Sequence, residues 1–334
     1  MQAQDLQRRL AAYLETQFDV EVVVKTARPL AGGASRDSWA LDLRLGDQDF
    51  TWVMRRDLPT QMFDESLNRA QEYALMDTAY RSGVLVAPVR HLCTDPSVLD
   101  GAFFLMDYIH AISIGPKVMQ APELAQARQR LPEQMAEQLA KIHAIDASNL
   151  EFLPRPQPGQ TPAQAVIAQC YAILDALKVQ NPVWEWTLRW AIRHAPTPVT
   201  QTFVHGDFRI GNLLIDESGL RAVIDWEFGH IGDPDEELGY VCMRDWRFGN
   251  GHLRCAGLCD RERFLRAYEL ASGRTVDRTS VTWWEVMGNI RWGIICMSQA
   301  NRHLSGAEQS VELASLGRRS AEMQLEALRL IEAS

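Results

Sequence analysis

The sequence predicts an α+β chain of two lobes, in which a small antiparallel β-rich lobe with one inserted helix precedes a larger, mainly helical lobe. Three observations indicate this class. The chain has 334 residues, more than one ordinary small domain needs. Its first hundred residues contain segments in which apolar and polar residues alternate, whereas long helical segments dominate beyond Ile109. We therefore expect a first lobe at residues 1–108 and a second at residues 109–334.

The first lobe opens with an amphipathic helix, MQAQDLQRRLAAYLETQ. Five later segments are rich in β-branched and aromatic residues and alternate in polarity, which is typical of strands. They lie at residues 21–30, 38–45, 49–56, 88–93 and 102–109. Between the third and fourth strands, apolar residues recur at helical spacing from Phe63 to Ser82, and Gly83 follows as a stop signal.

Helical segments account for most of the second lobe. We expect them at residues 121–146, 163–177, 183–195, 260–272, 281–301 and 306–333. A proline-rich stretch from Leu153 to Pro162 predicts a surface connector or a loop on the substrate side. One short β-hairpin interrupts the helices, with LLID and RAVID as strands and Glu217–Gly219 as the turn.

Charge and composition exclude several function classes. The formal net charge is −9 and the pI is near 5.4, so the overall field repels nucleic acids and anionic lipid. The chain shows neither the apolar stretch of a signal peptide nor the long charge-free run that a membrane span needs. Six scattered cysteines suit a reducing compartment. We expect a cytoplasmic protein whose partner is a small molecule.

The polar residues on both sides of the hairpin point to phosphoryl transfer. Asp207 and Asn212 precede the hairpin and Asp225 follows it. Phosphoryl transfer needs one carboxylate that accepts or orients the hydroxyl proton, and oxygen ligands that hold Mg²⁺ against the phosphates. Asp207 is therefore the catalytic candidate, and Asn212 and Asp225 are the candidate metal ligands.

The two segments VHGDFRIGNLLID and VIDWEFGHIGDPDEELG resemble the aminoglycoside phosphotransferase and choline kinase superfamily. The resemblance implies a bilobal protein-kinase-like fold, a catalytic loop of the pattern H-G-D-x-x-x-x-N, and ATP with Mg²⁺ as cofactors. The stretch RWGIICMSQANRH is similar to a branch related to the kinase domain of acyl-CoA dehydrogenase fusion proteins, which is linked with phosphorylation of hydroxyacyl-CoA esters.

The same resemblance implies nucleotide contacts in the first lobe. The loop LAGGASRDSW, with Gly33 and Ser35, takes the place of the family's loop over the phosphates. No lysine stands in the strand where protein kinases carry one, so Arg55 is the phosphate cation, with Arg56 in reserve and Glu72 as its ion-pair partner. The adenine would meet the chain near Met106, Asp107 and Tyr108.

Two departures from the family pattern concern loop bracing and the acceptor. Glu237 stands where the family often has an aspartate that braces the catalytic loop. On the acceptor side, a helical stretch with aromatic neighbours carries cations that suit an anionic acceptor better than a polycation. The cations are Arg291, Arg302 and His303, and the aromatic residues are Trp283, Trp284 and Trp292.

Together these features predict a small-molecule kinase that transfers the γ-phosphate of MgATP to a hydroxyl group. A hydroxyacyl-CoA or another anionic metabolite is the favoured acceptor. Two alternatives stay open: an aminoglycoside phosphotransferase, and a catalytically silent nucleotide-binding protein, for which the missing lysine and Glu237 would be the arguments.

Overall fold

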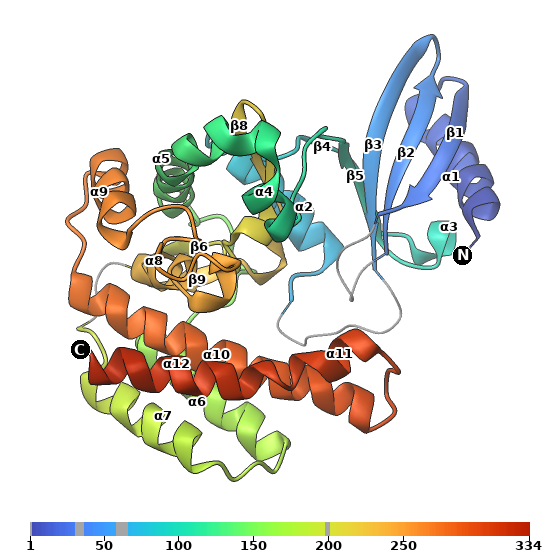
Figure 1. Cartoon of the computed structure of the whole chain (residues 1–334). Coiled ribbons are helices and arrows are strands. Elements are labelled where there is room, and N and C mark those ends of the chain that lie inside the picture. Colours follow the sequence, from blue (N-terminus) through green and yellow to red (C-terminus); the bar gives the residue numbers. More distant parts are fainter. Residues whose placement is uncertain (1, 31–36, 58–65, 198–200) are drawn as a thin grey trace.

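The computed structural model describes residues 2–30, 37–57, 66–197 and 201–334, which form two lobes (Figure 1). The N-terminal lobe contains a five-stranded antiparallel sheet in the order β1-β2-β3-β5-β4. Its strands are β1 (Val22–Pro29), β2 (Asp37–Leu45), β3 (Gln48–Arg56), β4 (Val89–Cys93) and β5 (Phe103–Asp107). The five expected strands are therefore confirmed within a few residues at each end.

Helices cover both faces of this sheet (Figure 1). Helix α1 (Ala3–Phe18) packs its leucines against one face, where Trp52 and Met54 of β3 also lie. Helix α2 (Arg69–Arg81) covers the other face, which carries Val53. Because side chains alternate along a strand, Arg55 lies on the α2 face and Arg56 on the α1 face. A short helix, α3 (Pro96–Leu99), connects β4 to β5.

The C-terminal lobe is mainly helical, as expected. Its helices are α4 (Gly115–Gln120), α5 (Ala125–His143), α6 (Pro162–Ala176), α7 (Pro182–His194), α8 (Pro234–Val241), α9 (Arg261–Ser272), α10 (Arg278–Leu304), α11 (Val311–Leu316) and α12 (Arg319–Glu332). The expected single helix at residues 306–333 was wrong. A break at Gly317 divides it, and a Cβ there would lie 2.9 Å from the Cβ of Ala300 on α10.

Two small sheets lie inside this lobe and hold the chemistry-bearing loops. The predicted hairpin is confirmed as β7 (Leu213–Asp216) and β8 (Gly219–Val223). Strands β6 (Thr202–Val204) and β9 (His230–Gly232) form a second antiparallel pair that the sequence analysis missed. Three-residue strands are too short for alternation to reveal them.

One apolar cluster runs through both lobes. It joins Val53, Phe104 and Met106 of the sheet to Leu139 on α5 and Phe203 on β6. A second cluster is confined to the C-terminal helices and includes Trp184, Trp283 and Trp284. The expected lobe boundary at residues 108 and 109 stays a prediction, since the shared core crosses it. None of the helices in the described ranges is long and apolar enough to cross a membrane.

Candidate active site

The loop between β6 and β7 holds Asp207 among three polar side chains. Tyr240 on α8 donates its hydroxyl to Oδ1 of Asp207 at 2.6 Å, and Asn212 donates its amide to Oδ2 at 2.6 Å. Arg209 Nε lies 3.1 Å from Oδ1. These contacts orient the Asp207 carboxylate, whose side chain keeps 14% of its surface exposed. The structure thus brings together Asp207 and Asn212, as the sequence predicted.

His205 shapes this loop from within the core. Its Nδ1 accepts a hydrogen bond from the Asp207 backbone N–H at 3.2 Å. Nε2 must then carry the proton, and it donates to the carbonyl of Ile224 at 3.0 Å. Gly206 follows with φ +85°, and a Cβ at this position would clash with the carbonyl oxygen of Phe228. Both residues tie the catalytic loop to the segment after β8.

Glu237 on α8 braces the same loop. One carboxylate oxygen accepts the His205 N–H at 3.0 Å and the other accepts the Gly206 N–H at 3.1 Å. His143 at the end of α5 donates its Nε2–H to Glu237 at 2.9 Å. Burial alone would raise the pKa of Glu237, but these hydrogen bonds and His143 lower it below its usual value. The glutamate side chain, one methylene longer than aspartate, thus accepts both the His205 and the Gly206 N–H.

Asp225 lies beside Asn212 because the hairpin returns the chain to its starting point. The N–H of Ile224 donates to the carbonyl of Asn212 at 2.9 Å. This bond brings Asp225, the residue after Ile224, next to Asn212, the other predicted metal ligand. Asp225 adopts the left-handed conformation at φ 70°, which is uncommon for a residue other than glycine. Such backbone strain is concentrated at functional sites.

Arg55 bridges the two lobes at this point. Its guanidinium lies 2.8 Å from Asp225 Oδ1 and 3.5 Å from Glu72 Oε1 on α2. Burial would raise the pKa of Asp225, but Arg55 and Arg209 lower it below its usual value. Arg56, the reserve candidate, points to the other face of the sheet, where it pairs with Asp37 and the carbonyl of Leu99. The predicted Arg55–Glu72 pair is present.

The donor set fits a magnesium ion. Asn212 uses its amide N–H on Asp207, which leaves its oxygen as an acceptor. Asp225 engages Arg55 through Oδ1 and retains a second carboxylate oxygen. Mg²⁺ prefers such oxygen ligands and keeps several waters, so one amide and one carboxylate suffice on the protein side.

The predicted nucleotide contacts in the first lobe have different outcomes. Gly33 and Ser35 lie outside the described residues. Met106 is buried in β5 and belongs to the shared core. Tyr108 follows β5, and its backbone N–H donates to the carbonyl of Thr51 at 3.0 Å. Their contact with adenine stays a prediction.

The sequence analysis did not identify Tyr240 and Arg209 as site residues. Arg209 stands inside the H-G-D-x-x-x-x-N motif, so its position was a usable signal, and its guanidinium also lies 5.0 Å from the ring centroid of Trp246. Tyr240 is distant in sequence and reaches Asp207 only because α8 packs beneath the loop. Burial and the Asp207 charge raise the pKa of Tyr240 well above its usual value, so it donates a hydrogen bond.

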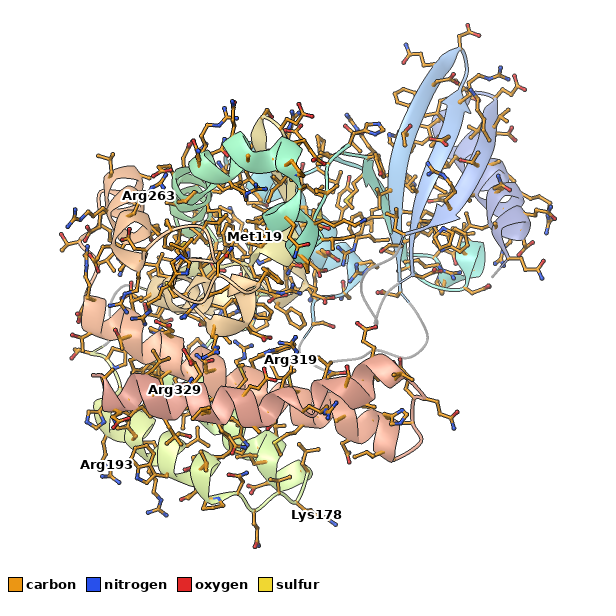
Figure 2. All side chains as sticks on the ribbon, viewed as in Figure 1. Met119, Lys178, Arg193, Arg263, Arg319 and Arg329 are labelled. Carbon is orange, nitrogen blue, oxygen red and sulfur yellow. The ribbon has the colours of Figure 1, made fainter. Side chains whose placement is uncertain are left out.

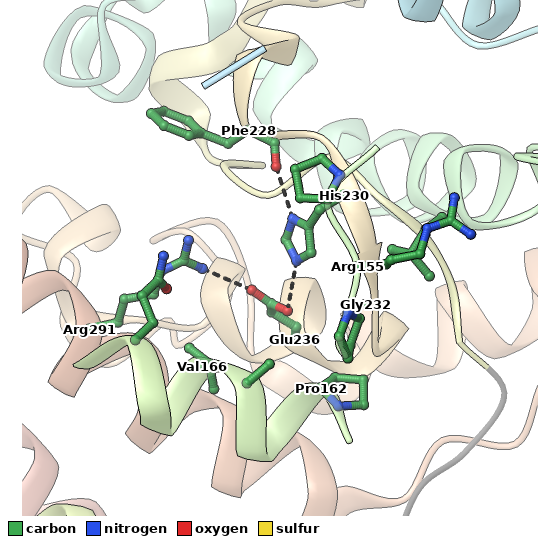
Figure 3. Close-up of a pocket in the computed structure, with 13 residues that line it drawn as sticks. Arg155, Pro162, Val166, Phe228, His230, Gly232, Glu236 and Arg291 are labelled. Atoms are coloured by element: carbon green, nitrogen blue, oxygen red, sulfur yellow. Dashed lines mark hydrogen bonds and ion pairs between the residues drawn. The ribbon is translucent and has the colours of Figure 1, made fainter. Parts of the chain in front are cut away.

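On the acceptor side, the proposed cations have different surroundings. Arg291 lines a cavity of about 430 Å³ (Figure 3). Trp283 and Trp284 are buried core residues, and Trp292 donates to Asp245 at 2.6 Å. The remaining two candidates, Arg302 and His303, engage Glu308 and the Ser310 N–H respectively.

Two relatives show where similar sequences occur. Acyl-CoA dehydrogenase family member 10 of Mus musculus is 28% identical over 206 residues, which cover 60% of this chain and 19% of that protein. The probable acyl-CoA dehydrogenase IBR3 of Arabidopsis thaliana is 25% identical over 326 residues, which cover 90% of this chain and 38% of that protein. The chain thus spans well under half the length of these relatives.

Solved structures show the same fold. A structure from Ralstonia eutropha JMP134, assigned as an aminoglycoside phosphotransferase, matches with a TM-score of 0.76, at 21% identity and 98% coverage of both chains. A spectinomycin phosphotransferase in complex with ADP and spectinomycin matches with a TM-score of 0.64, at 12% identity and 98% coverage of both chains. These similarities establish the bilobal protein-kinase-like fold.

The sequence model of the Phosphotransferase enzyme family matches residues 26–283, a span that contains Arg55, Glu72, the Asp207 loop and Asp225. This match covers more than half of the chain, and it agrees with the fold and with the geometry around Asp207. The chain belongs to the Phosphotransferase enzyme family.

Proposed function

We propose that the chain transfers the γ-phosphate of ATP to a hydroxyl group of a small molecule. The arrangement around Asp207 carries this proposal, because it combines an oriented carboxylate with two oxygen ligands and a buried arginine. The acceptor hydroxyl would lie at Asp207, which takes its proton as the oxygen bonds to the γ-phosphorus. The bond to the β–γ bridging oxygen then breaks, and ADP leaves.

Arginines would stabilise the phosphates during this transfer. Arg55 keeps its charge at any physiological pH and can grip phosphate oxygens through its planar fork. Arg209 lies beside Asp207 and can face the transferred group. Asn212 and Asp225 would hold Mg²⁺, which neutralises phosphate charge when bound.

We favour an anionic acceptor such as a hydroxyacyl-CoA. Arg291 lines the cavity next to the site, and the names of the two relatives refer to acyl-CoA. The aminoglycoside alternative draws support from the spectinomycin that a structural neighbour binds. A catalytically silent protein is less consistent with Glu237, which braces the loop as an aspartate would.

The first test measures ADP release by the wild-type protein with MgATP and a panel of hydroxy acids, hydroxyacyl-CoA esters, choline and aminoglycosides. Turnover with one acceptor class is expected. Absence of turnover with every acceptor, together with absence of magnesium-dependent ATP binding by calorimetry, would contradict the proposal.

Variants then assign the roles. Asp207→Asn should bind MgATP like the wild type and lose transfer by at least about 100-fold, the range of a proton-transfer group. Asp225→Asn should weaken ATP binding only when magnesium is present. The exposed Asp175→Asn on α6 is the control. Loss of ATP binding in Asp207→Asn would show that Asp207 contacts the nucleotide rather than the acceptor.

A further inference from the structure

The cavity that Arg291 lines has the composition of a binding site for a molecule with an apolar body and an acidic group. Figure 3 shows that it lies between the start of α6, strand β9 and helices α8 and α10. Its volume of about 430 Å³ falls within the range of small-molecule pockets. Apolar residues form much of the wall: Pro154, Pro156, Pro162, Ala165, Val166, Phe228 and Ile231.

Three ionisable side chains stand together at its inner wall. Glu236 lies between two cations, with Arg291 Nη1 at 3.0 Å from Oε1 and His230 Nε2 at 3.4 Å from Oε2 (Figure 3). Gly232 makes room for them, since a Cβ there would lie 3.0 Å from His230 Nε2 and 3.2 Å from Glu236 Oε2.

The hydrogen-bond partners of His230 indicate the charge of this group. His230 Nδ1 lies 2.9 Å from the carbonyl oxygen of Phe228, which can only accept, and the Glu236 carboxylate also can only accept. Both ring nitrogens of His230 therefore face acceptors, an arrangement that favours the doubly protonated ring. Burial would lower the pKa of His230, but Glu236 raises it above its usual value. With His230 protonated, two positive charges flank one negative charge, so these half-buried side chains carry a net charge of about +1.

The cavity adjoins the catalytic loop on two sides. Glu236 and Tyr240 lie one turn apart on α8, and Tyr240 donates to Asp207. Phe228, which lines the cavity, presses its carbonyl against Gly206, the residue before Asp207. The cavity thus lies beside the segment that holds Asp207, although Asp207 is not among its lining residues.

We propose that this cavity is the acceptor subsite, and that it takes an acceptor with an aliphatic body and an acidic group that Arg291 and His230 hold. This inference rests on the proposed function and adds the place and the recognising residues of its acceptor. Because the cavity carries positive charge, it disfavours binding of a polycation. The acidic group can be the carboxylate of a hydroxy acid or a phosphate of a hydroxyacyl-CoA.

The test is equilibrium binding by calorimetry without nucleotide, so it does not depend on turnover. The probes are a medium-chain hydroxycarboxylate, its methyl ester, the corresponding hydroxyacyl-CoA and kanamycin. The wild type should bind one or both acidic probes more tightly than the ester, and kanamycin least. Equal or tighter binding of kanamycin, or no binding of either acidic probe, would overturn the proposal.

A cavity-filling variant tests the location. Ala165→Phe should weaken binding of the acidic probe by at least about tenfold, or about 1.4 kcal/mol. Ala172→Phe is the matched control, because Ala172 is exposed on the same helix. Equal binding by the two variants would place the acceptor elsewhere.

Charge variants test the recognition of the acidic group. Arg291→Gln should weaken the acidic probes by about tenfold and leave the methyl ester unchanged, while Arg291→Lys should recover most of the loss. Arg263→Gln is the control, since Arg263 on α9 pairs with Glu133 at 2.7 Å (Figure 2). An equal loss for acid and ester in Arg291→Gln would show that Arg291 is only structural.

The two acidic probes also separate the sources of the acidic group. If Arg291→Gln weakens only the hydroxycarboxylate, the subsite recognises a carboxylate, and if it weakens only the CoA ester, the subsite recognises a phosphate. Binding of ATP with magnesium, measured in every variant, should stay unchanged. Absence of magnesium-dependent ATP binding by the wild type would contradict the proposed function and not the subsite.

Discussion

At the scale of single residues, the site depends on side chains that connect loops rather than on isolated catalytic groups. Glu237 is the clearest case, since its two oxygens hold consecutive amides of the catalytic loop and also receive His143. A buried carboxylate with three donors keeps its position only while every donor is present.

The Glu237→Gln variant tests this brace. The amide nitrogen of glutamine cannot accept a hydrogen bond, so one loop amide would lose its partner inside the core. We expect a loss of about 1–3 kcal/mol in the free energy of unfolding, with a lower kcat and an unchanged KM for ATP. Urea unfolding and steady-state kinetics would measure both. The exposed Glu217→Gln is the control, and equal stability of the two variants would contradict a bracing role.

Arg55 is a second connecting residue, because it joins β3 to α2 and to the segment after the hairpin. In Arg55→Met, Glu72 would keep Arg69 but lose one buried cation, and we expect a loss of about 3 kcal/mol in unfolding free energy. Arg55→Lys keeps the charge and should lose less. Urea unfolding measures these losses, with the exposed Arg28→Met as the control. Equal losses for Arg55→Met and Arg28→Met would contradict this account.

Sequence patterns could group the candidate residues that lie close together in the sequence. Asp207 and Asn212 lie five residues apart on one loop, and Asp225 follows a hairpin that turn residues revealed. Tyr240, His230 and Glu236 could not be found in this way, and Arg291 was named only as an acceptor-side cation. Their contacts exist only because α8 and α10 pack against the loop and β9, and pairing between distant helices leaves no local periodicity.

At the scale of elements, the same limit applies. Helices with a regular apolar stripe, such as α5 and α9, were predicted within a few residues. The break between α11 and α12 was missed because only a single glycine, Gly317, marks it in the sequence. A Cβ at Gly317 would lie 2.9 Å from the Cβ of Ala300 on α10. Strands β6 and β9 were missed because each pairs over three residues only.

The turn at Gly206 offers a test at this scale. Gly206→Ala places a methyl group against the Phe228 carbonyl in addition to straining a positive φ, whereas Gly249→Ala, at φ +92° with open space around it, adds only the strain. We expect Gly206→Ala to lose more unfolding free energy than the control by at least about 1 kcal/mol, and to lose transfer activity. Thermal unfolding and ADP release would measure this. Similar losses of unfolding free energy in both variants would mean that the backbone at Phe228 shifts to accept the methyl group at little cost.

At the scale of the whole molecule, buried carboxylates give the stability a defined pH dependence. Burial and the charge of Glu72 raise the pKa of Asp57 to about 6, although Arg69 Nε lies 2.9 Å from its carboxylate. The folded chain thus binds this proton more tightly than the unfolded chain, and the contribution of Asp57 to stability falls as the pH rises from 3.8 to about 6. Asp233 contributes with the same sign.

Replacing Asp57 by asparagine removes this titration. The free energy of unfolding of Asp57→Asn, relative to wild type, should increase as the pH rises through that range. Urea unfolding at several pH values measures the difference, with Asp175→Asn as the exposed control. Parallel pH profiles for wild type and Asp57→Asn would show that the carboxylate titrates normally.

The apolar cluster that joins both lobes has a consequence for cooperativity. Val53, Phe104 and Met106 share it with Leu139 and Phe203, so melting either lobe would uncover the buried surface of the other. Scanning calorimetry should therefore give one endotherm rather than two, with equal calorimetric and van't Hoff enthalpies. A fragment that ends at residue 108 should not be stable by itself. The two lobes that the shape of the molecule distinguishes are therefore not separate units of folding.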